Sequence, residues 1–342
     1  MSLGEKSILL SPFTYQGQTI SSVSYDDVLT QHAAADRGQN DKNNKMREAI
    51  IGAIINNQIP ETYYLTERWR ALKTAVDGFL AECGGGGGGN ETGYSRVECI
   101  PAAGRGHNYD FSVKFTGRNS EDTATTTTTT NTNTTTYHVE FKFNAAKVSD
   151  APQFVSPMKP SQYLSGSYEE YFYDKYMARI AAAAAAAATT IPDRTEWLKQ
   201  IHNNAPACVK HLQDKYYAGC AKSSQFTKAA DDIAFYELCK KVSTESIRGF
   251  IAEHDLNIVK LSEYLRESQE GKTYMLFQPA AAAAGPTITL QRVDPADYNI
   301  VSCAPNPSKS RYDCVTQSGK KVRVLLRWKN GNGIAFPAFQ IS

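Results

Sequence analysis

Two stretches of the chain alternate hydrophobic and polar residues in the way that β-strands do. In the first, the hydrophobic positions are Tyr109, Phe111, Val113 and Phe115. The second repeats the pattern with Tyr137, Val139, Phe141 and Phe143. Because the side chains of a strand point alternately to its two faces, each stretch predicts a strand with one buried aromatic face and one polar face.

The polar positions of these two predicted strands carry charged side chains. Asp110 lies on the first strand, and Glu140 and Lys142 lie two residues apart on the second. Residues two apart on a strand project to the same side, so Glu140 and Lys142 share a face whatever the register. Pairing of the two strands would bring Asp110 to that face. Two carboxylates and a lysine at one sheet edge suit a hard divalent cation such as Mg²⁺, which also contacts phosphate.

This arrangement resembles the active-site pattern of the PD-(D/E)XK superfamily, the restriction-endonuclease-like nucleases. In that pattern an Asp is followed one strand later by Glu-x-Lys, here Asp110 and then Glu140, Phe141 and Lys142. The resemblance implies that Asp110, Glu140 and the Phe141 carbonyl bind Mg²⁺, with Mn²⁺ as a substitute. It also implies that Lys142 positions the attacking water, and that the chain is a metal-dependent endonuclease that hydrolyses phosphodiester bonds in DNA.

A helix is predicted upstream of these strands, over residues 41–59. Its hydrophobic stripe at helical spacing consists of Met46, Ile50, Ile51, Ile54 and Ile55, and Asp41 is the expected N-cap. Nucleases of the superfamily commonly place a Glu on this helix, so the resemblance makes Glu48 a candidate to assist at the metal. A solvated helix glutamate is the alternative interpretation. A second helix is predicted after Pro60.

A glycine-containing turn, GRGHN, leads into Asp110. It carries Arg105, His107 and Asn108, which the nuclease interpretation places near the scissile phosphate. His107 as a general base competes with the simpler interpretation of a solvated turn histidine.

The densest basic segment is the run KKVRVLLRWK near the C-terminus. Arg323, Arg327 and Lys329 would contact phosphates of a nucleic acid, and Trp328 would stack on a base. The alternative is a charged edge strand that discourages aggregation.

The chain as a whole is predicted to be an α/β (α+β) protein. Its expected parts are an N-terminal arm (1–40), a nuclease-like core (41–180), a helical segment (190–270) and a β-rich C-terminal segment packed on the core (271–342). The core is expected to be a restriction-endonuclease-like mixed sheet flanked by helices.

Composition narrows the functional classes only slightly. In 342 residues, 37 Lys and Arg balance 35 Asp and Glu, so any surface that binds nucleic acid must be local. The seven cysteines lack C-x-x-C spacing and indicate reduced intracellular thiols. A signal peptide and a membrane span are not evident. We therefore expect an intracellular protein of the cytoplasm or nucleus, neither secreted nor membrane-bound.

Two other hypotheses remain open at this point. The chain would be a non-catalytic nucleic-acid-binding protein with a degenerate nuclease fold, or an unrelated α+β interaction protein in which Glu-x-Lys is a coincidence. The nuclease resemblance also allows a homodimer, because sequence-specific enzymes of this fold are often two-fold dimers. The general character of the amino-acid sequence resembles that of proteins from large DNA viruses and their algal or protist hosts.

Overall fold

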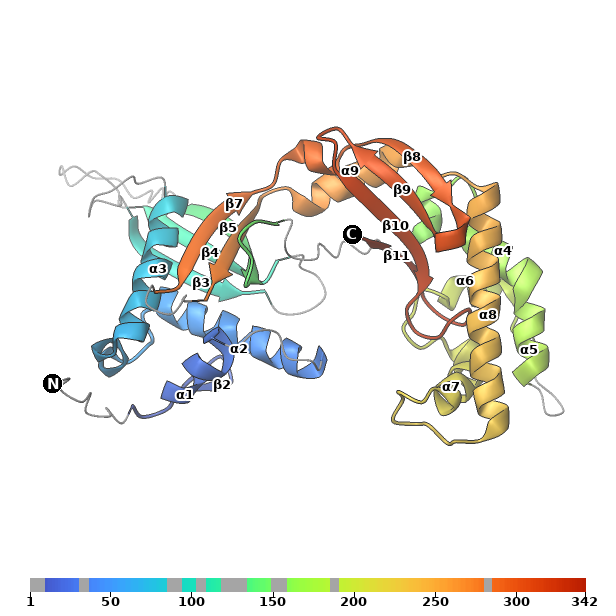
Figure 1. Cartoon of the computed structure of the whole chain (residues 1–342), viewed down its shortest axis with the longest axis horizontal. Helices are drawn as coiled ribbons and strands as arrows, with labels where there is room; N and C mark the ends of the chain where they lie inside the picture. Colours follow the sequence, from blue (N-terminus) through green and yellow to red (C-terminus); the bar gives the residue numbers. More distant parts are fainter. Residues whose placement is uncertain are drawn as a thin grey trace, which may run out of the picture. The chain divides into compact units, whose positions relative to one another are not determined.

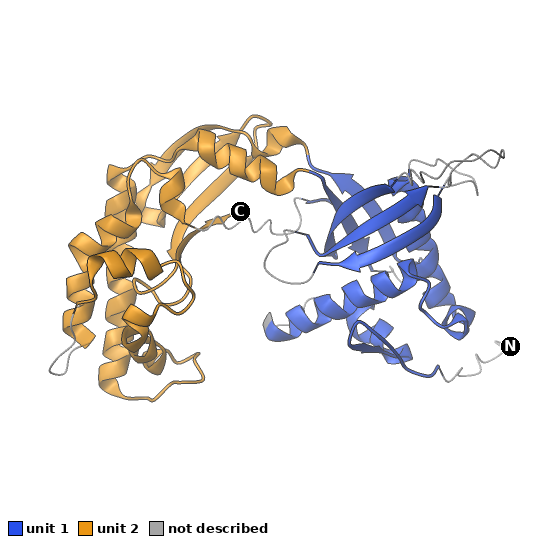
Figure 2. Ribbon diagram, turned by 180° about the vertical axis from the view of Figure 1, so that it is seen from behind, with its two compact units in different colours: residues 1–151, 271–293 blue, residues 152–270, 294–342 orange. Residues whose placement is uncertain are grey.

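The computed structural model describes residues 10–30, 37–84, 94–102, 109–117, 134–148, 159–184, 191–279 and 285–342. The chain divides into two compact units (Figure 2). Unit 1 consists of Met1–Ala151 and Gly271–Val293, and unit 2 consists of Pro152–Glu270 and Asp294–Ser342. Each unit therefore joins segments that are far apart in the sequence.

A five-stranded mixed sheet forms the centre of unit 1 (Figure 1). Its strands in spatial order are β3 (Tyr94–Pro101), β4 (Phe111–Gly117), β5 (Thr134–Phe143), β6 (Lys272–Gln278) and β7 (Thr287–Arg292). The first three are antiparallel neighbours, β6 runs parallel to β5, and β7 is antiparallel to β6. Parallel neighbours need a long crossover, and here most of unit 2 is inserted between β5 and β6. The predicted mixed α+β fold is thereby confirmed.

Helices and a small hairpin complete unit 1. In chain order they are β1 (Phe13–Tyr15), β2 (Gln18–Ile20), α1 (Ser22–Tyr25), α2 (Arg37–Ile55) and α3 (Glu67–Cys83). The stripe of α2, with Ile50, Ile51 and Ile54 buried, shares one hydrophobic core with the sheet. Because α2 begins at Arg37, Asp41 lies inside the helix, and its predicted N-cap role is wrong.

The alternation predicted for β4 and β5 is confirmed. Phe111 pairs with Val139 in an antiparallel register. The side chains buried in the core of unit 1 are Phe111, Val113, Phe115, Val139 and Phe141. The intervening residues take the opposite face, where Ser112 Oγ lies 3.1 Å from His138 Nδ1. This register fixes which polar residues of the two strands face each other.

Unit 2 combines helices with a four-stranded antiparallel sheet of order β11-β10-β9-β8 (Figure 1). The helices are α4 (Tyr168–Phe172), α5 (Ala178–Ala184), α6 (Arg194–Gln200), α7 (Lys210–Gly219), α8 (Ala230–Glu253) and α9 (Ile258–Gln269). The strands are β8 (Ile300–Asn306), β9 (Arg311–Thr316), β10 (Lys321–Trp328) and β11 (Pro337–Ile341). A π-helical turn, Tyr173–Met177, joins α4 to α5.

This division differs from the boundaries expected from the sequence. The expected arm 1–40 includes Tyr15, Ile20 and Tyr25, which are buried in the core of unit 1. Strands β6 and β7 complete the sheet of unit 1, whereas β8 to β11 belong to unit 2. The aromatic segment around Tyr168 also belongs to unit 2, since its rings pack against residues from α8 and β10.

Trp328 is part of the core of unit 2. Its side chain is 4% exposed, and its Nε1 donates a hydrogen bond to the Tyr168 hydroxyl at 2.9 Å. The Tyr168 hydroxyl also lies 3.0 Å from Ser246 Oγ, and the Phe172 ring lies 4.8 Å from that of Trp328. The prediction that Trp328 stacks on a nucleic-acid base is therefore wrong, because the ring is enclosed by its own protein.

Cys303 and Cys314 are directly opposite each other on β8 and β9 and are joined by a disulfide. The prediction of reduced thiols is therefore wrong for this pair. The free cysteines are Cys83, Cys99, Cys208, Cys220 and Cys239.

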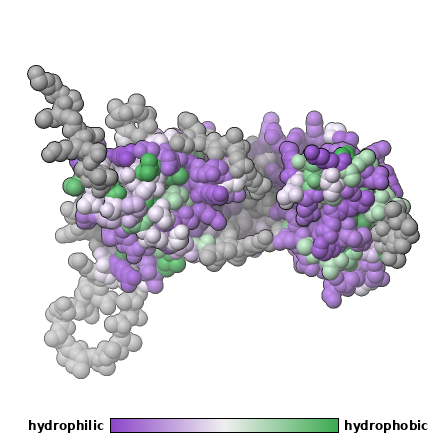
Figure 3. All heavy atoms as spheres, turned by 90° about the horizontal axis from the view of Figure 1, so that it is seen from below, coloured by the Kyte–Doolittle hydropathy of each residue, from purple (hydrophilic) through white to green (hydrophobic). Residues whose placement is uncertain are grey.

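The face of the molecule seen in Figure 3 is mainly hydrophilic, with hydrophobic residues scattered among the polar ones. Such scattered residues are ordinary on a water-exposed surface. Within the described ranges, no helix is both long enough and apolar enough to pass through a membrane.

Replacing Trp328 with Ala should destabilise unit 2 by about 3–5 kcal/mol, because a buried indole is lost and the Tyr168 hydroxyl loses a donor. Arg327→Ala is the matched control, since Arg327 is the exposed neighbour on the same strand, and it should change stability by less than about 0.5 kcal/mol. Urea unfolding followed by tryptophan fluorescence and near-UV circular dichroism measures both. Equal, small effects of the two substitutions would show that Trp328 is not a core residue.

Candidate active site

Asp110 lies immediately before β4, at the point where the ladder between β4 and β5 ends. Its backbone N–H donates to the Val139 carbonyl at 2.9 Å, so Asp110 faces the same residue of β5 as Phe111 does, and the regular pairing stops there. Its carboxylate Oδ2 accepts the backbone N–H of Phe141 at 2.8 Å. The carboxyl group is therefore held at the end of the strand, beside the Glu-x-Lys segment, as the sequence predicted.

Glu140 is contacted by two lysines. Lys142 Nζ lies 2.6 Å from its Oε1, and Lys272 Nζ lies 3.4 Å from its Oε2. All three side chains are largely enclosed, with 18% of Glu140, 19% of Lys142 and 8% of Lys272 exposed. The predicted juxtaposition of Glu140 and Lys142 on one face is thus present, and the carboxylate is balanced by a second cation.

Sequence reasoning did not identify Lys272. It begins β6, where it pairs in the parallel register with His138 of β5. The sequence carries a weak signal for it, because a lysine opens an otherwise apolar run, KTYMLFQ. The pairing itself was not predictable, since β6 follows the long inserted segment of unit 2. Burial lowers the pKa of Lys272, and the adjacent Glu140 counteracts this effect.

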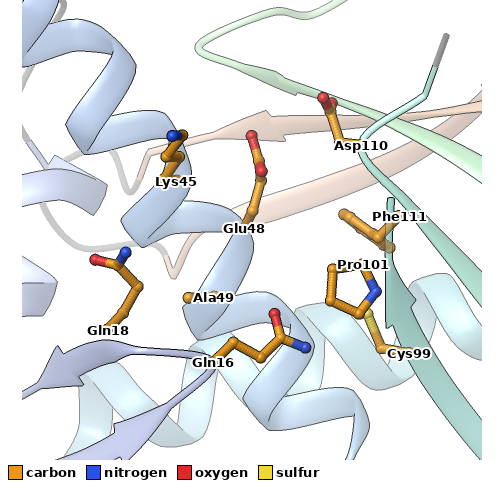
Figure 4. Close-up of a pocket in the computed structure, with 9 residues that line it drawn as sticks. All are labelled: Gln16, Gln18, Lys45, Glu48, Ala49, Cys99, Pro101, Asp110 and Phe111. Atoms are coloured by element: carbon orange, nitrogen blue, oxygen red, sulfur yellow. The ribbon is translucent and has the colours of Figure 1, made fainter. Parts of the chain in front are cut away.

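Glu48 extends from α2 toward the same space as Asp110 (Figure 4). The neighbouring Arg47 anchors the helix, because its Nε donates to the Val28 carbonyl at 2.6 Å and its guanidinium lies 3.6 Å from the centroid of the Phe143 ring. With the helix held between the N-terminal segment and β5, Glu48 is directed at the end of β4.

The carboxyl groups of this site lie close enough to affect one another's protonation. Burial, and then the charges of Asp110 and Glu140, raise the pKa of Glu48 to about 8. Burial and the charge of Glu140 raise the pKa of Asp110 to about 6, against the opposing effects of the Phe141 hydrogen bond and of Lys142 and Lys272. Mutual repulsion of this kind is reduced when a cation binds between carboxylates.

The donor atoms present fit a cation that keeps several of its waters. Asp110 and Glu140 supply carboxylate oxygens. The Phe141 carbonyl lies on the same side of β5 as the Phe141 N–H and beyond the last β4–β5 pair, so it is outside that ladder. The described residues contain no group of three or more His, Cys, Asp or Glu side chains that could hold a metal ion. Mg²⁺ is often bound by only one or two carboxylates together with water and substrate phosphate.

The other predicted site residues lie elsewhere. Arg105, His107 and Asn108 fall outside the described residues. Arg323 and Arg327 are exposed on β10 of unit 2, where Arg327 donates a hydrogen bond to Gln340. Lys329 follows β10, and its Nζ lies 5.8 Å from the centroid of the Phe336 ring.

Comparison of the chain with protein-family models, curated proteins and solved structures finds no match. The chemistry of the site is therefore argued from its geometry. That geometry consists of the juxtaposed Asp110, Glu140 and Lys142, with Glu48 facing them and Lys272 on Glu140.

Glu48→Gln should stabilise the metal-free protein at alkaline pH. The pKa of Glu48 is raised from 4.5 to about 8 in the folded state, so folding favours the protonated carboxyl, and stability falls as pH rises through this window. Removing the charge should increase the free energy of unfolding by about 2 kcal/mol above pH 8, allowing for partial exposure of the side chain, and by little below pH 4.5.

Thermal unfolding in a chelator at acid and alkaline pH measures this effect. Asp41→Asn is the control, because Asp41 is an exposed carboxylate on the same helix. If the increase in stability were the same at both pH values, or the same in both variants, it would contradict the raised pKa of the Glu48 carboxyl group.

Proposed function

We propose that this protein is a Mg²⁺-dependent nuclease that hydrolyses phosphodiester bonds in DNA, with a site of the PD-(D/E)XK type. The observation that carries the proposal is the position of Asp110. Its carboxylate is held on the Phe141 amide at 2.8 Å, directly beside the Glu140–Lys142 pair. The proximity of these residue types, on adjacent strands as in the family pattern, supports the proposal.

The topology also supports the proposal. The order that the resemblance implies is a helix, three strands that carry the acidic residues, and a second helix; the helical segment from Tyr168, expected as that second helix, belongs instead to unit 2, so the support comes from the first part of the order. Helices α2 and α3 precede the antiparallel strands β3, β4 and β5. Asp110 and Glu140 stand at the same end of the two adjacent strands, and Glu48 comes from the preceding helix.

Each residue has a distinct proposed role. Asp110, Glu140 and the Phe141 carbonyl would hold Mg²⁺ or Mn²⁺. The ion would neutralise charge on the phosphate and lower the pKa of the attacking water. Lys142 would orient this water and offset the negative charge that develops on the phosphate. Glu48 would accept a hydrogen bond from the water.

Lys272 adds a role that the resemblance did not suggest. It contacts the Glu140 oxygen that Lys142 does not contact. The two lysines thus hold both carboxylate oxygens of Glu140 in a partly enclosed site. Lys272 would therefore position Glu140, so that Lys142 is free to turn toward the substrate.

The proposed partner is DNA, and its phosphates would contact the exposed side chains of Arg323 and Arg327 on β10. These arginines project from the outer side of the strand, because Val324, Leu326 and Trp328 fill the inner side. The alternation leaves both guanidinium groups accessible to a polyanion.

Purified protein should cut DNA with Mg²⁺ or Mn²⁺ and lose this activity in a chelator. Ca²⁺ should support binding but little cutting, because it acidifies water less.

Asp110→Asn and Glu140→Gln should abolish cutting, and Lys142→Met should reduce its rate by about 100-fold or more. Glu98→Gln is the control, since Glu98 lies on β3 of the same sheet and pairs with Arg96. Cutting of a labelled duplex and of single-stranded DNA measures the rates. The enzyme proposal fails if the wild-type protein cuts neither substrate, or if the Asp110 and Glu140 variants cut as well as wild type.

Replacing Arg323 and Arg327 together with Ala should weaken DNA binding at every sequence and reduce its dependence on salt. Each lost phosphate contact should lower the slope of log affinity against log salt concentration by about 0.9. Fluorescence anisotropy with the uncleaving Asp110→Asn protein gives this slope. Lys240→Ala is the control, because Lys240 is an α8 side chain paired with Glu237. If the slope of the double variant equalled that of the parent protein, these arginines would not contact phosphates, and their role would be structural only.

A further inference from the structure

A polar pocket adjoins the proposed catalytic residues in unit 1 (Figure 4). Glu48 and Asp110 form one part of its lining, and Gln16, Gln18 and Lys45 form another. Its volume is about 150 Å³. Drug-sized ligands occupy pockets of roughly 300–1,000 Å³, whereas an apolar cavity of about 150 Å³ holds one benzene ring. The pocket therefore suits a single heterocyclic ring.

The turn between β1 and β2 places the two glutamines on this pocket. Gln16 and Gly17 both have positive φ, at 49° and 74°, and they connect Tyr15 directly to Gln18. A two-residue turn with two positive φ angles matches the twist of a hairpin. Gln16 Nε2 donates to the Tyr15 hydroxyl at 2.9 Å, and Asn56 Nδ2 donates to the same hydroxyl at 2.8 Å. The turn is thereby attached to the C-terminal end of α2.

Several polar groups of the pocket retain their hydrogen-bonding capacity. Among the described residues, the side-chain amide of Gln18 and the side-chain carbonyl of Gln16 have no hydrogen-bond partner, and the Lys45 ammonium has no ion-pair partner within 4.0 Å. Ala49, Pro101 and Phe111 add apolar contact surface to the lining. Free amides beside apolar surface are the groups with which proteins bind the edges and faces of a nucleobase.

We propose that this pocket is a nucleobase subsite, which takes the base of a nucleotide next to the scissile phosphate. Gln16 and Gln18 would hydrogen-bond to the base edge, and Lys45 would contact the phosphate on that nucleotide. This inference rests on the proposed function, because the phosphate beside Asp110 would be the one that is cut. It gives the β1–β2 turn, which lies within the expected N-terminal arm, a role in substrate binding.

The test is calorimetric titration of the full-length protein, with Mg²⁺ present, using the four deoxynucleoside 5′-monophosphates and deoxyribose 5-phosphate. Wild-type protein should bind at least one of the two pyrimidine monophosphates, whose base is a single ring, about tenfold more tightly than the sugar phosphate, since two hydrogen bonds to the base are gained. Gln16→Gly combined with Gln18→Ala should remove this difference. Gly suits the positive φ of position 16, so the turn should persist. Lys45→Ala should weaken binding of the monophosphates and of the sugar phosphate alike.

Gln58→Ala is the matched control, because Gln58 is an exposed glutamine of the same unit and does not line the pocket. It should leave every affinity unchanged. The readout does not require cleavage, so failure of the two proposals can be distinguished. Glutamine-dependent binding without DNA cutting would keep the subsite and overturn the nuclease. DNA cutting with no glutamine-dependent preference for the base, or no binding of any monophosphate, would overturn the subsite.

Discussion

The pairing of β4 with β5 determines which side chains come together in the candidate active site. The ladder ends at the pair Phe111 and Val139, and the next residue, Asp110, bonds to β5 through both its backbone and its carboxylate. A shift of one residue in this register would move Glu140 and Lys142 to the other face of the sheet. The buried aromatic residues prevent such a shift, because they fill the core only in the observed register. The packing of the core thus fixes the distance between two carboxylates that would otherwise repel each other.

Charge balance is the second constraint on this region. Burial favours neutral carboxyl groups, and it raises the pKa of both Glu48 and Asp110. Glu140 is compensated directly by Lys142 and Lys272. A site in which Glu48 and Asp110 lie near a glutamate paired with two lysines suits a divalent cation and a phosphate together. The same arrangement costs stability when neither is bound, as is common for functional sites.

Local periodicity predicted the parts of this structure that depend on neighbouring residues. The alternation around Phe111 and Val139 gave both strands, their buried faces and the juxtaposition of Asp110 with Glu140. Lys272 was missed because its parallel pairing joins segments separated by most of unit 2, which no local pattern reports. Trp328 was misassigned although the signal was present. Val324, Leu326 and Trp328 alternate with Arg323 and Arg327, so the strand pattern itself places the indole inside. The role of the β1–β2 turn was hidden because so short a hairpin has little periodicity.

The central claim is that one divalent cation binds between Asp110 and Glu140 at the end of β4. Anomalous diffraction from crystals grown with Mn²⁺ tests this directly, because it locates the metal without reference to activity. We expect a single strong peak in unit 1, within coordination distance of carboxylate oxygens of Asp110 and Glu140 and of the Phe141 carbonyl. The Asp110→Asn variant should lack this peak. A peak elsewhere, or no peak while Lys142 and Lys272 remain on Glu140, would contradict the claim.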